Sequence, residues 1–294
     1  MLHNPLKGIG LMLLSGLFLT TNDGISKWFV PHYPTAQILF GASINVVLII
    51  VLYQVFIRRK RFAIRDYRLH CLRGALFTIA SFAFVAALKY LPLATVVCIA
   101  FAGPLFMTLM GKLFLGETVG RYRLASVCVG FVGVVFMVNP TVSPLHWSVL
   151  LPLVVAVCDA ARDVTTRKMT VSEDSVTIVM TTSLVVCAVS LLTAGDHWSW
   201  PDTQHLLLFV GAGFFMVVAY FLMVEAYRHA PTVVLAPFRY VQIIWSILAG
   251  IVVWNEYPQW WIYIGLCLTA GSGIFIAYRE YVTRNTHGNA DTGA

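Results

Sequence analysis

Long apolar stretches alternate with short polar links along almost the whole chain. A helix needs about 20 mostly apolar residues to cross the hydrocarbon core of a bilayer, and ten stretches approach or reach this length. They lie roughly at residues 6–30, 35–57, 70–90, 93–115, 122–139, 146–167, 176–194, 204–227, 232–253 and 260–281. We therefore predict an all-α integral membrane protein with ten transmembrane helices.

The sequence repeats itself after a shift of 139 residues. The matching pairs are Gly74 and Gly213, Ala80 and Ala219, Phe82 and Phe221, Val85 and Val224, Ala87 and Ala226, Pro92 and Pro231, Leu109 and Leu248, Gly111 and Gly250, Glu117 and Glu256, Cys128 and Cys267, and Phe136 and Phe275. We expect one five-helix repeat at residues 1–140 and a second at 141–284. An odd number of crossings inverts the second repeat relative to the first, which is a transporter architecture.

Composition agrees with this interpretation. Hydrophobic residues make up 59% of the chain and charged residues only 11%, and the mean hydropathy is +0.80. These values are typical of a protein embedded in lipid. The loops leave no room for a soluble domain, and only residues 285–294 are predicted to form a disordered cytoplasmic tail.

Basic residues set the predicted orientation. Most of them fall on alternate connections between the spans, with Lys89 as an exception. The clusters are Arg58, Arg59, Lys60, Arg61, Arg65 and Arg68, then Arg121 and Arg123, Arg167 and Lys168, and Arg279 and Arg284. By the positive-inside rule, we expect both termini to be cytoplasmic in a multi-pass protein of a bacterial inner membrane. The net charge of +7 is then explained by contact with the lipid bilayer, and no nucleic-acid partner is expected.

Several other classes of protein do not fit the sequence. The first apolar segment is longer than a signal-peptide core and contains Asp23 and Lys27, so we interpret it as a retained helix. Six scattered cysteines form neither a disulfide framework nor a metal motif. We expect no metal, no cofactor and no enzymatic activity, since no catalytic or phosphate-binding motif is present.

Charged residues inside the predicted spans are candidates for a binding site, because each costs about 2.5–3.5 kcal/mol to insert and is rarely left facing lipid. Asp23 and Lys27 are four residues apart and can either neutralise each other or meet a charged solute. Asp159 and Asp163 lie on one face of the sixth span with Arg162, so one arginine can balance two carboxylates and leave a net negative charge.

Two further candidates lie near the second-repeat spans 204–227 and 232–253. Glu225 can form an interfacial salt bridge or, if buried, carry a proton. Arg239 follows Pro237 inside a span, and we expect it either to hold a solute carboxylate or to lock onto Asp23 or Glu225. The aromatic rings of Phe238 and Tyr240, on either side of Arg239, can pack over an apolar or cationic part of the solute.

The fifth and tenth spans carry small residues and no central charge. These include Gly130, Gly133, Gly265 and Gly271. Small residues allow helices to approach closely, so these spans are expected to pack together or to form a homodimer contact.

Ten spans in two halves, each with a proline-led fourth helix ending near Glu117 or Glu256, resemble the drug/metabolite transporter superfamily in its EamA-like branch. The segments around Asp23, Asp159, Arg239 and Glu256 are similar to those of S-adenosylmethionine uptake transporters of intracellular bacteria. The resemblance implies a central cavity bounded by helices 1, 3, 4, 6, 8 and 9. In such a cavity the adenine of S-adenosylmethionine could stack on an aromatic ring, and the candidates are Phe84, Tyr220, Phe238 and Tyr240. One departure is that Gln37 and its neighbours include no arginine, which many relatives carry there.

We therefore expect a secondary active transporter that moves a small zwitterionic metabolite, such as S-adenosylmethionine, by alternating access. Exchange and ion coupling both remain open as the driving force. An amino-acid or drug exporter of the same superfamily is the alternative, and a polytopic membrane enzyme is a remote one.

Overall fold

The computed structural model describes residues 5–290 except 60–63, 104, 107–108, 111–120, 139–146, 170–172, 196–197, 230–234 and 236–237. Within this part of the chain the regular structure is helical. The α-helices are α1 (Pro5–Phe29), α2 (Thr35–Leu52), α3 (Tyr67–Ala87), α4 (Leu93–Ala100), α6 (Arg121–Val138), α7 (Leu150–Met169), α8 (Ser175–Leu192), α9 (Thr203–His229), α11 (Val241–Trp254) and α12 (Trp260–Ala290). A π-helical turn, Tyr53–Arg58, extends α2, and a 3₁₀ turn, Trp147–Val149, precedes α7.

Each of these helices overlaps one of the ten predicted spans. Among the described residues, four segments are long and apolar enough to cross a membrane, namely Leu6–Phe29, Thr35–Arg58, Tyr67–Ala87 and Thr203–Met223. Large apolar side chains point outward from the bundle: Leu192 is 86% exposed and Val252 is 79% exposed. A surface of this kind suits lipid rather than water.

Local sequence explains where several helices begin and end. The side chain of Asp66 caps α3, because its Oδ1 accepts hydrogen bonds from the backbone N–H groups of Arg68 at 3.0 Å and Leu69 at 3.2 Å. Asn255 ends α11 in the left-handed conformation, with φ of 53°. The N–H of Glu256 then donates to the carbonyl of Gly250 at 3.0 Å, so the chain turns sharply at this point.

The fourth helix of each predicted repeat is interrupted. α4 ends at Ala100 and a turn follows at Phe101, whereas α11 begins only after a turn at Tyr240. Phe101 and Tyr240 are equivalent under the 139-residue shift. The predicted spans 93–115 and 232–253 are therefore not continuous α-helices, and their Glu117 and Pro237 lie outside the described residues.

Helix packing follows the repeat. α1 packs on α9 as α7 packs on α3, and α2 packs on α9 as α8 packs on α3. Two further pairings, α2 with α8 and α6 with α12, join equivalent helices. α11 packs on α1 and α4 packs on α7, and these two helices, which also contact each other, are different parts of the equivalent predicted spans 232–253 and 93–115. The most extensive pairings are thus unchanged when the two halves of the sequence are exchanged.

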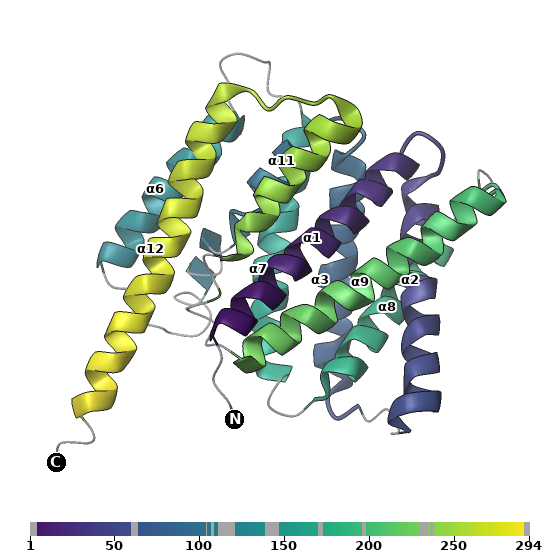
Figure 1. Ribbon diagram of the computed structural model, residues 1–294, viewed down its shortest axis with the longest axis horizontal. Coiled ribbons are helices and arrows are strands. Elements are labelled where there is room, and N and C mark those ends of the chain that lie inside the picture. Colours follow the sequence, from purple (N-terminus) through teal and green to yellow (C-terminus); the bar gives the residue numbers. More distant parts are fainter. Residues whose placement is uncertain are drawn as a thin grey trace.

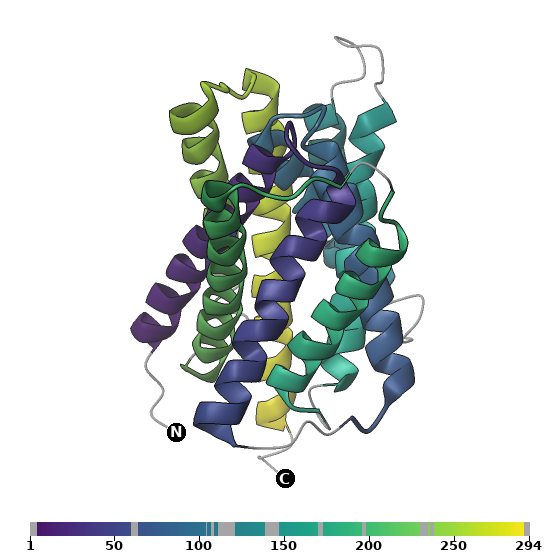
Figure 2. The ribbon, with the colours of Figure 1, turned by 90° about the vertical axis from the view of Figure 1, so that its right-hand side faces the viewer.

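The spatial arrangement places α6 and α12 together at one side of the bundle, beyond α11 (Figure 1). α1 begins and α12 ends at the same end of the molecule, as an even number of crossings requires (Figures 1 and 2). α12 continues to Ala290, so residues 285–290 are helical where the sequence predicted a disordered tail. This segment contains no proline, and the helix continues past the apolar part of α12 without a residue that would stop it.

The small residues of α6 and α12 form the contact between these two helices. Thr269 Oγ1 donates to the carbonyl of Gly130 at 3.3 Å, and Ser272 Oγ donates to the carbonyl of Ser126 at 2.6 Å. A Cβ atom added to Gly133 would lie 2.7 Å from the carbonyl oxygen of Gly265. The predicted packing of these spans on each other is confirmed, and it occupies small residues that had also suggested a homodimer contact.

Candidate functional site

The centre of the site is an arginine held between two carboxylates on α7. Arg162 Nη1 lies 2.6 Å from Asp159 Oδ1, and its Nη2 lies 2.9 Å from Asp163 Oδ1. Arg162 and Asp163 follow Asp159 by three and four positions, so both can contact it on one side of the helix. The prediction that one arginine balances two carboxylates is confirmed. The Asp159 and Asp163 side chains keep 31% and 33% of their surface exposed, so they remain accessible.

Side chains from other helices converge on this group. Tyr220 of α9 interacts electrostatically with Arg162 and both carboxylates. Arg239, which precedes α11, interacts with Asp159 and Asp163 in the same way. Asp23 of α1 interacts with Asp159 across the bundle. The cluster around Arg162 thus contains five of the predicted site residues, which are Asp23, Asp159, Asp163, Tyr220 and Arg239.

A small pocket borders the cluster on the side of α1. It is lined by Met12, Ser15, Gly16, Leu19, Met223, Arg239 and Gln242. Gln242 Nε2 donates to Asp23 Oδ2 at 3.4 Å, which connects this pocket to the carboxylate on α1. α1 and α11 pack closely here, since a Cβ at Gly16 would lie in ordinary contact, 3.5 Å from the Cβ of Gln242. Arg239 therefore faces polar partners, as expected of an intramembrane arginine.

Arg73 of α3 is a functional candidate that the sequence analysis missed. Its Nε donates to Thr166 Oγ1 at 2.9 Å, and its Nη1 donates to Thr182 Oγ1. The residue is only 8% exposed. It falls inside the predicted span 70–90, so the cost of an intramembrane charge was a signal that could have identified it. The basic run that ends at Arg68 made Arg73 look like part of a cytoplasmic flank.

Arg73 changes the charge of the site. Asp23, Asp159 and Asp163 supply three carboxylates, and Arg73, Arg162 and Arg239 supply three guanidinium groups. The surplus of negative charge expected from the α7 residues is therefore absent from this cluster as a whole. A site with equal numbers of positive and negative groups is suited to a solute that carries charges of both signs.

Lys27 lies apart from this cluster and pairs with Glu256. Its Nζ contacts Glu256 Oε2, which also accepts a hydrogen bond from the backbone N–H of Leu93 at 3.3 Å. The ammonium group lies 5.0 Å from the ring centroid of Trp254. Of the two alternatives for Lys27, the ion pair with Asp23 is not the one the structure shows, because the turn after α11 brings Glu256 over the end of α1.

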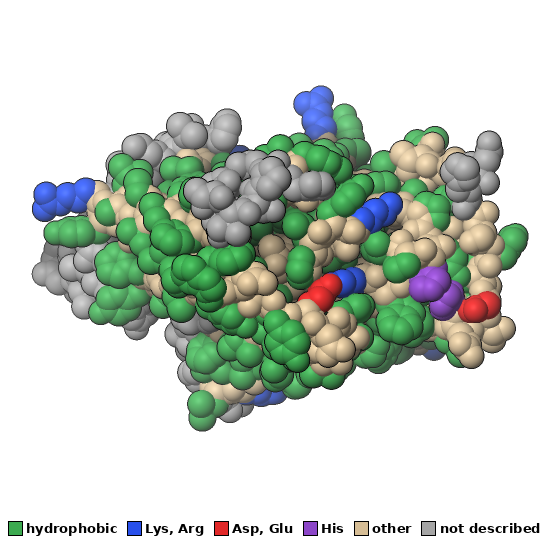
Figure 3. All heavy atoms as spheres, turned by 90° about the horizontal axis from the view of Figure 1, so that it is seen from above, with side chains coloured by type: hydrophobic (Ala, Val, Ile, Leu, Met, Phe, Trp, Pro, Cys, Tyr) green, Lys and Arg blue, Asp and Glu red, His purple; other side chains and the backbone are tan. Residues whose placement is uncertain are grey.

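This ion pair is at the end of the bundle opposite the start of α1. A view onto that end shows acidic and basic side chains in contact within a mainly hydrophobic surface (Figure 3). The Lys27 side chain is 8% exposed and that of Glu256 is 28% exposed. Gln37 also has a structural role, as its Oε1 accepts a hydrogen bond from the N–H of Ser199 at 3.3 Å.

The other predicted site residues occupy different environments. Phe84 is partly buried against three hydrophobic clusters, and Phe238 packs against the cluster of Met12, Ala226 and Leu235. Tyr240 contacts the Phe101 ring, and its hydroxyl points at Gly273 of α12. Glu225 lies 3.8 Å from His229 Nδ1, one helical turn away near the end of α9.

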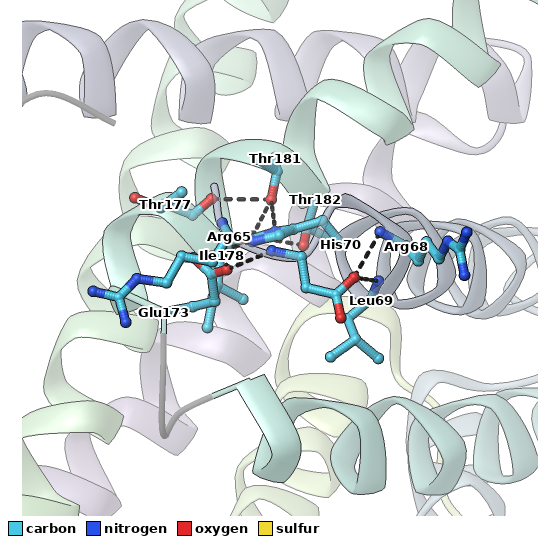
Figure 4. Close-up of polar contacts among 10 residues, drawn as sticks. Arg65, Arg68, Leu69, His70, Glu173, Thr177, Ile178, Thr181 and Thr182 are labelled. Atoms are coloured by element: carbon cyan, nitrogen blue, oxygen red, sulfur yellow. Dashed lines mark hydrogen bonds and ion pairs between the residues drawn. The ribbon is translucent and has the colours of Figure 1, made fainter. Parts of the chain in front are cut away.

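A second polar cluster joins α3 to α8 and to the segment before it (Figure 4). Glu173 Oε1 accepts hydrogen bonds from the backbone N–H groups of Arg65 at 2.8 Å and Asp66 at 3.0 Å. His70 Nδ1 lies 2.7 Å from Thr181 Oγ1. Burial raises the pKa of the Glu173 carboxyl, but these N–H groups and His70 outweigh it, so the pKa lies below its usual value.

Comparisons with known proteins agree with this architecture. A sequence profile described as the EamA-like transporter family matches residues 6–139 and, separately, residues 146–278. The S-adenosylmethionine uptake transporter of Rickettsia conorii is 26% identical, over 97% of this chain and 97% of its own length. The riboflavin transporter of Vibrio cholerae is also 26% identical, over 95% of each chain. A solved crystal structure matches with a TM-score of 0.62 and 16% identity, over 92% of this chain and 98% of that one, and this likeness concerns the fold alone.

Proposed function

We propose that this chain, which belongs to the EamA-like transporter family, is a secondary active transporter of a zwitterionic organic metabolite. The observation that carries the proposal is the balanced cluster of three carboxylates and three guanidinium groups inside the bundle. Charged groups inside a membrane protein are costly and mark solute pathways when they remain accessible. The proposed binding residues are Asp23, Arg73, Asp159, Arg162, Asp163, Tyr220 and Arg239.

S-adenosylmethionine is the substrate that fits this cluster best. Its carboxylate can meet an arginine, its ammonium or sulfonium group can meet Asp159 or Asp163, and its adenine can stack on an aromatic ring. The relatives from Rickettsia are named for uptake of this compound. Riboflavin, for which other relatives are named, has neither a carboxylate nor an ammonium group, so it would leave the charged cluster without matching partners.

The mechanism that we propose is alternating access by two inverted repeats, 1–140 and 141–284. Support comes from the separate profile matches to the two halves and from helix pairings that are preserved when the halves are exchanged. The interrupted helices at Phe101 and Tyr240 add to this, since broken helices beside a central site are common in inverted-repeat transporters. Movement of one repeat against the other would then expose the site to each side in turn.

We further propose that the protein lies in a bacterial inner membrane with both termini in the cytoplasm. The distribution of Arg and Lys favours this orientation. Import driven by exchange is the direction we favour, because the relatives are named for uptake. Export of an amino acid or a drug is the alternative within the same family.

Thermal stability of the purified protein tests the substrate assignment. A ligand at 100 times its Kd stabilises the folded state by about 2.7 kcal/mol. We expect S-adenosylmethionine and S-adenosylhomocysteine to raise the Tm, and riboflavin and common amino acids to leave it unchanged. Asp163→Asn should remove the shift, while Asp174→Asn, which alters the exposed pair with Arg58, should keep it. Stabilisation by riboflavin and not by S-adenosylmethionine would reject the assignment.

A further inference from the structure

Arg73 is a buried cation whose bonded partners are neutral. Two threonine hydroxyls, those of Thr166 and Thr182, accept its hydrogen bonds. Among the residues that the structure describes, no carboxylate lies within ion-pair distance of Arg73. A guanidinium buried in a membrane protein is destabilising unless a negative charge comes close to it.

The guanidinium of Arg73 also has N–H donors that make no hydrogen bond to a described residue. An arginine side chain has five N–H donors in a fixed planar fork. The hydrogen bonds to Thr166 and Thr182 start from Nε and Nη1, and within the described part of the chain none starts from Nη2. The threonines therefore fix the plane of the group and leave one edge of it for another acceptor.

Arg162 borders the same space between α3 and α7. Thr166 connects the two arginines, since its hydroxyl accepts from Arg73 and donates to the carbonyl of Arg162 at 2.7 Å. The Arg162 guanidinium lies 5.7 Å from the ring centroid of Phe77, which is one helical turn after Arg73 on the same face of α3. The two cations are thus held near each other by contacts to the same two helices.

The two arginines differ in what neutralises them. Arg162 bonds to Asp159 and Asp163 through all three of its nitrogen atoms. Arg73 interacts with these carboxylates only at longer range, and with Tyr220 of α9. A carboxylate placed beside Arg73 would receive a charge-assisted hydrogen bond and would also relieve the repulsion between the two arginines.

We propose that Arg73 is a specificity-determining residue that binds the carboxylate of the transported solute, with Thr166 and Thr182 holding its guanidinium in place. This inference rests on the proposed function, because it concerns the same site. It adds that the site discriminates between a solute with a carboxylate and the same solute without one. A purely structural Arg73, linking α3 to α7 and α8, would affect stability but not this discrimination.

Matched ligand pairs provide the test. The pairs are S-adenosylmethionine with decarboxylated S-adenosylmethionine, and S-adenosylhomocysteine with its methyl ester, each measured by thermal shift on purified wild-type protein, Arg73→Gln and Arg58→Gln. A hydrogen bond to a charged group changes affinity by about 10- to 100-fold. We expect wild type and the surface control Arg58→Gln to prefer the carboxylate member of at least one pair by this factor. Arg73→Gln should bind both members within about 2-fold of each other.

The result distinguishes this inference from the proposed function. Uptake of labelled S-adenosylmethionine into proteoliposomes tests transport, whereas the ratio within each pair tests the role of Arg73. An equal affinity of wild type for both members of every pair, or a preference that survives in Arg73→Gln, overturns the inference even if uptake is normal. If Arg73→Gln is not monodisperse in gel filtration, the preference within each ligand pair is measured on Arg73→Lys instead. Its ammonium group cannot keep the bond to Thr182 and reach the solute, so the preference should fall several-fold, and an unchanged preference contradicts the inference.

Discussion

The rings of Phe101 and Tyr240, which are 139 positions apart and equivalent in the sequence repeat, lie with their centroids 5.4 Å apart. Equivalent positions of two halves related by a two-fold axis can touch only near that axis. The hydrogen bond between Thr269 and Gly130, also 139 positions apart, meets the same condition. Both contacts are what an internal two-fold relation between the halves would produce, and Phe101 and Tyr240 adjoin the interruptions of the fourth helices.

Tyr240→Phe should leave uptake within about 2-fold of wild type and should not lower the Tm. The Tyr240 hydroxyl is buried and, among the described residues, has no hydrogen-bond partner, so its removal costs little. Tyr240→Ala should lower the Tm, because a cavity would replace the ring beside Phe101. A large loss of uptake in Tyr240→Phe would mean that the hydroxyl binds the solute and would contradict this expectation.

Lys27→Gln and Glu256→Gln should each destabilise the protein by about 1–3 kcal/mol, since each leaves a largely buried charge without its partner. The double variant with the two charges exchanged, Lys27→Glu with Glu256→Lys, should recover part of the loss. Chemical or thermal unfolding of the purified variants measures both effects. A double variant that is no more stable than the worse single variant would show that the pairing seen here contributes nothing.

Acidification should weaken the cluster around Glu173. The pKa of this carboxyl is lowered in the folded protein, so its contribution to stability is present at neutral pH and is lost as the pH falls through the folded-state pKa. Glu173→Gln should therefore lower the Tm at pH 7, by an amount corresponding to about 1 kcal/mol, because the amide oxygen can still accept both hydrogen bonds but the negative charge that strengthens them is lost. The difference from wild type should narrow towards pH 4, and a difference independent of pH would contradict the assignment.

Gly265→Ala should destabilise the contact between α6 and α12 by about 1–3 kcal/mol, because the added methyl group would meet the carbonyl of Gly133 and the side chain of Met137. Gly271→Ala on the same helix is the matched control. A Cβ at this position meets nothing within 4 Å, so this substitution should be neutral or slightly stabilising. Equal effects of the two substitutions on the Tm would show that the helices do not approach at Gly265.

The helices could be predicted from sequence because their apolar stretches have the length that a bilayer requires. The partners of individual charges could not, since a helical spacing allows a contact without excluding a better one. Asp23 and Lys27 have the spacing of an ion pair, yet Glu256 reaches Lys27 from a turn 229 residues away. The spacing of Asp159, Arg162 and Asp163 did predict their contacts, because all three lie on one helix with no nearer partner.

Arg73 was overlooked for a related reason. Its position in the sequence, just after a basic segment that is predicted to be cytoplasmic, resembles that of a residue that fixes orientation. Only the fold shows that α3 carries it inward against α7 and α8, where Thr166 and Thr182 hold it. The interruptions at Phe101 and Tyr240 were also hidden, because a broken helix keeps the apolar composition of a continuous one.

Counterflow in proteoliposomes tests the central claim most directly. Vesicles containing the purified protein are loaded with unlabelled S-adenosylmethionine, and entry of labelled S-adenosylmethionine is followed at low external concentration. We predict a transient accumulation above equilibrium with wild type and with the surface variant Asp174→Asn, and none with Asp163→Asn. Exchange of this solute through the charged cluster would be contradicted if wild type showed no accumulation of the label. It would also be contradicted if Asp163→Asn showed the same accumulation as wild type.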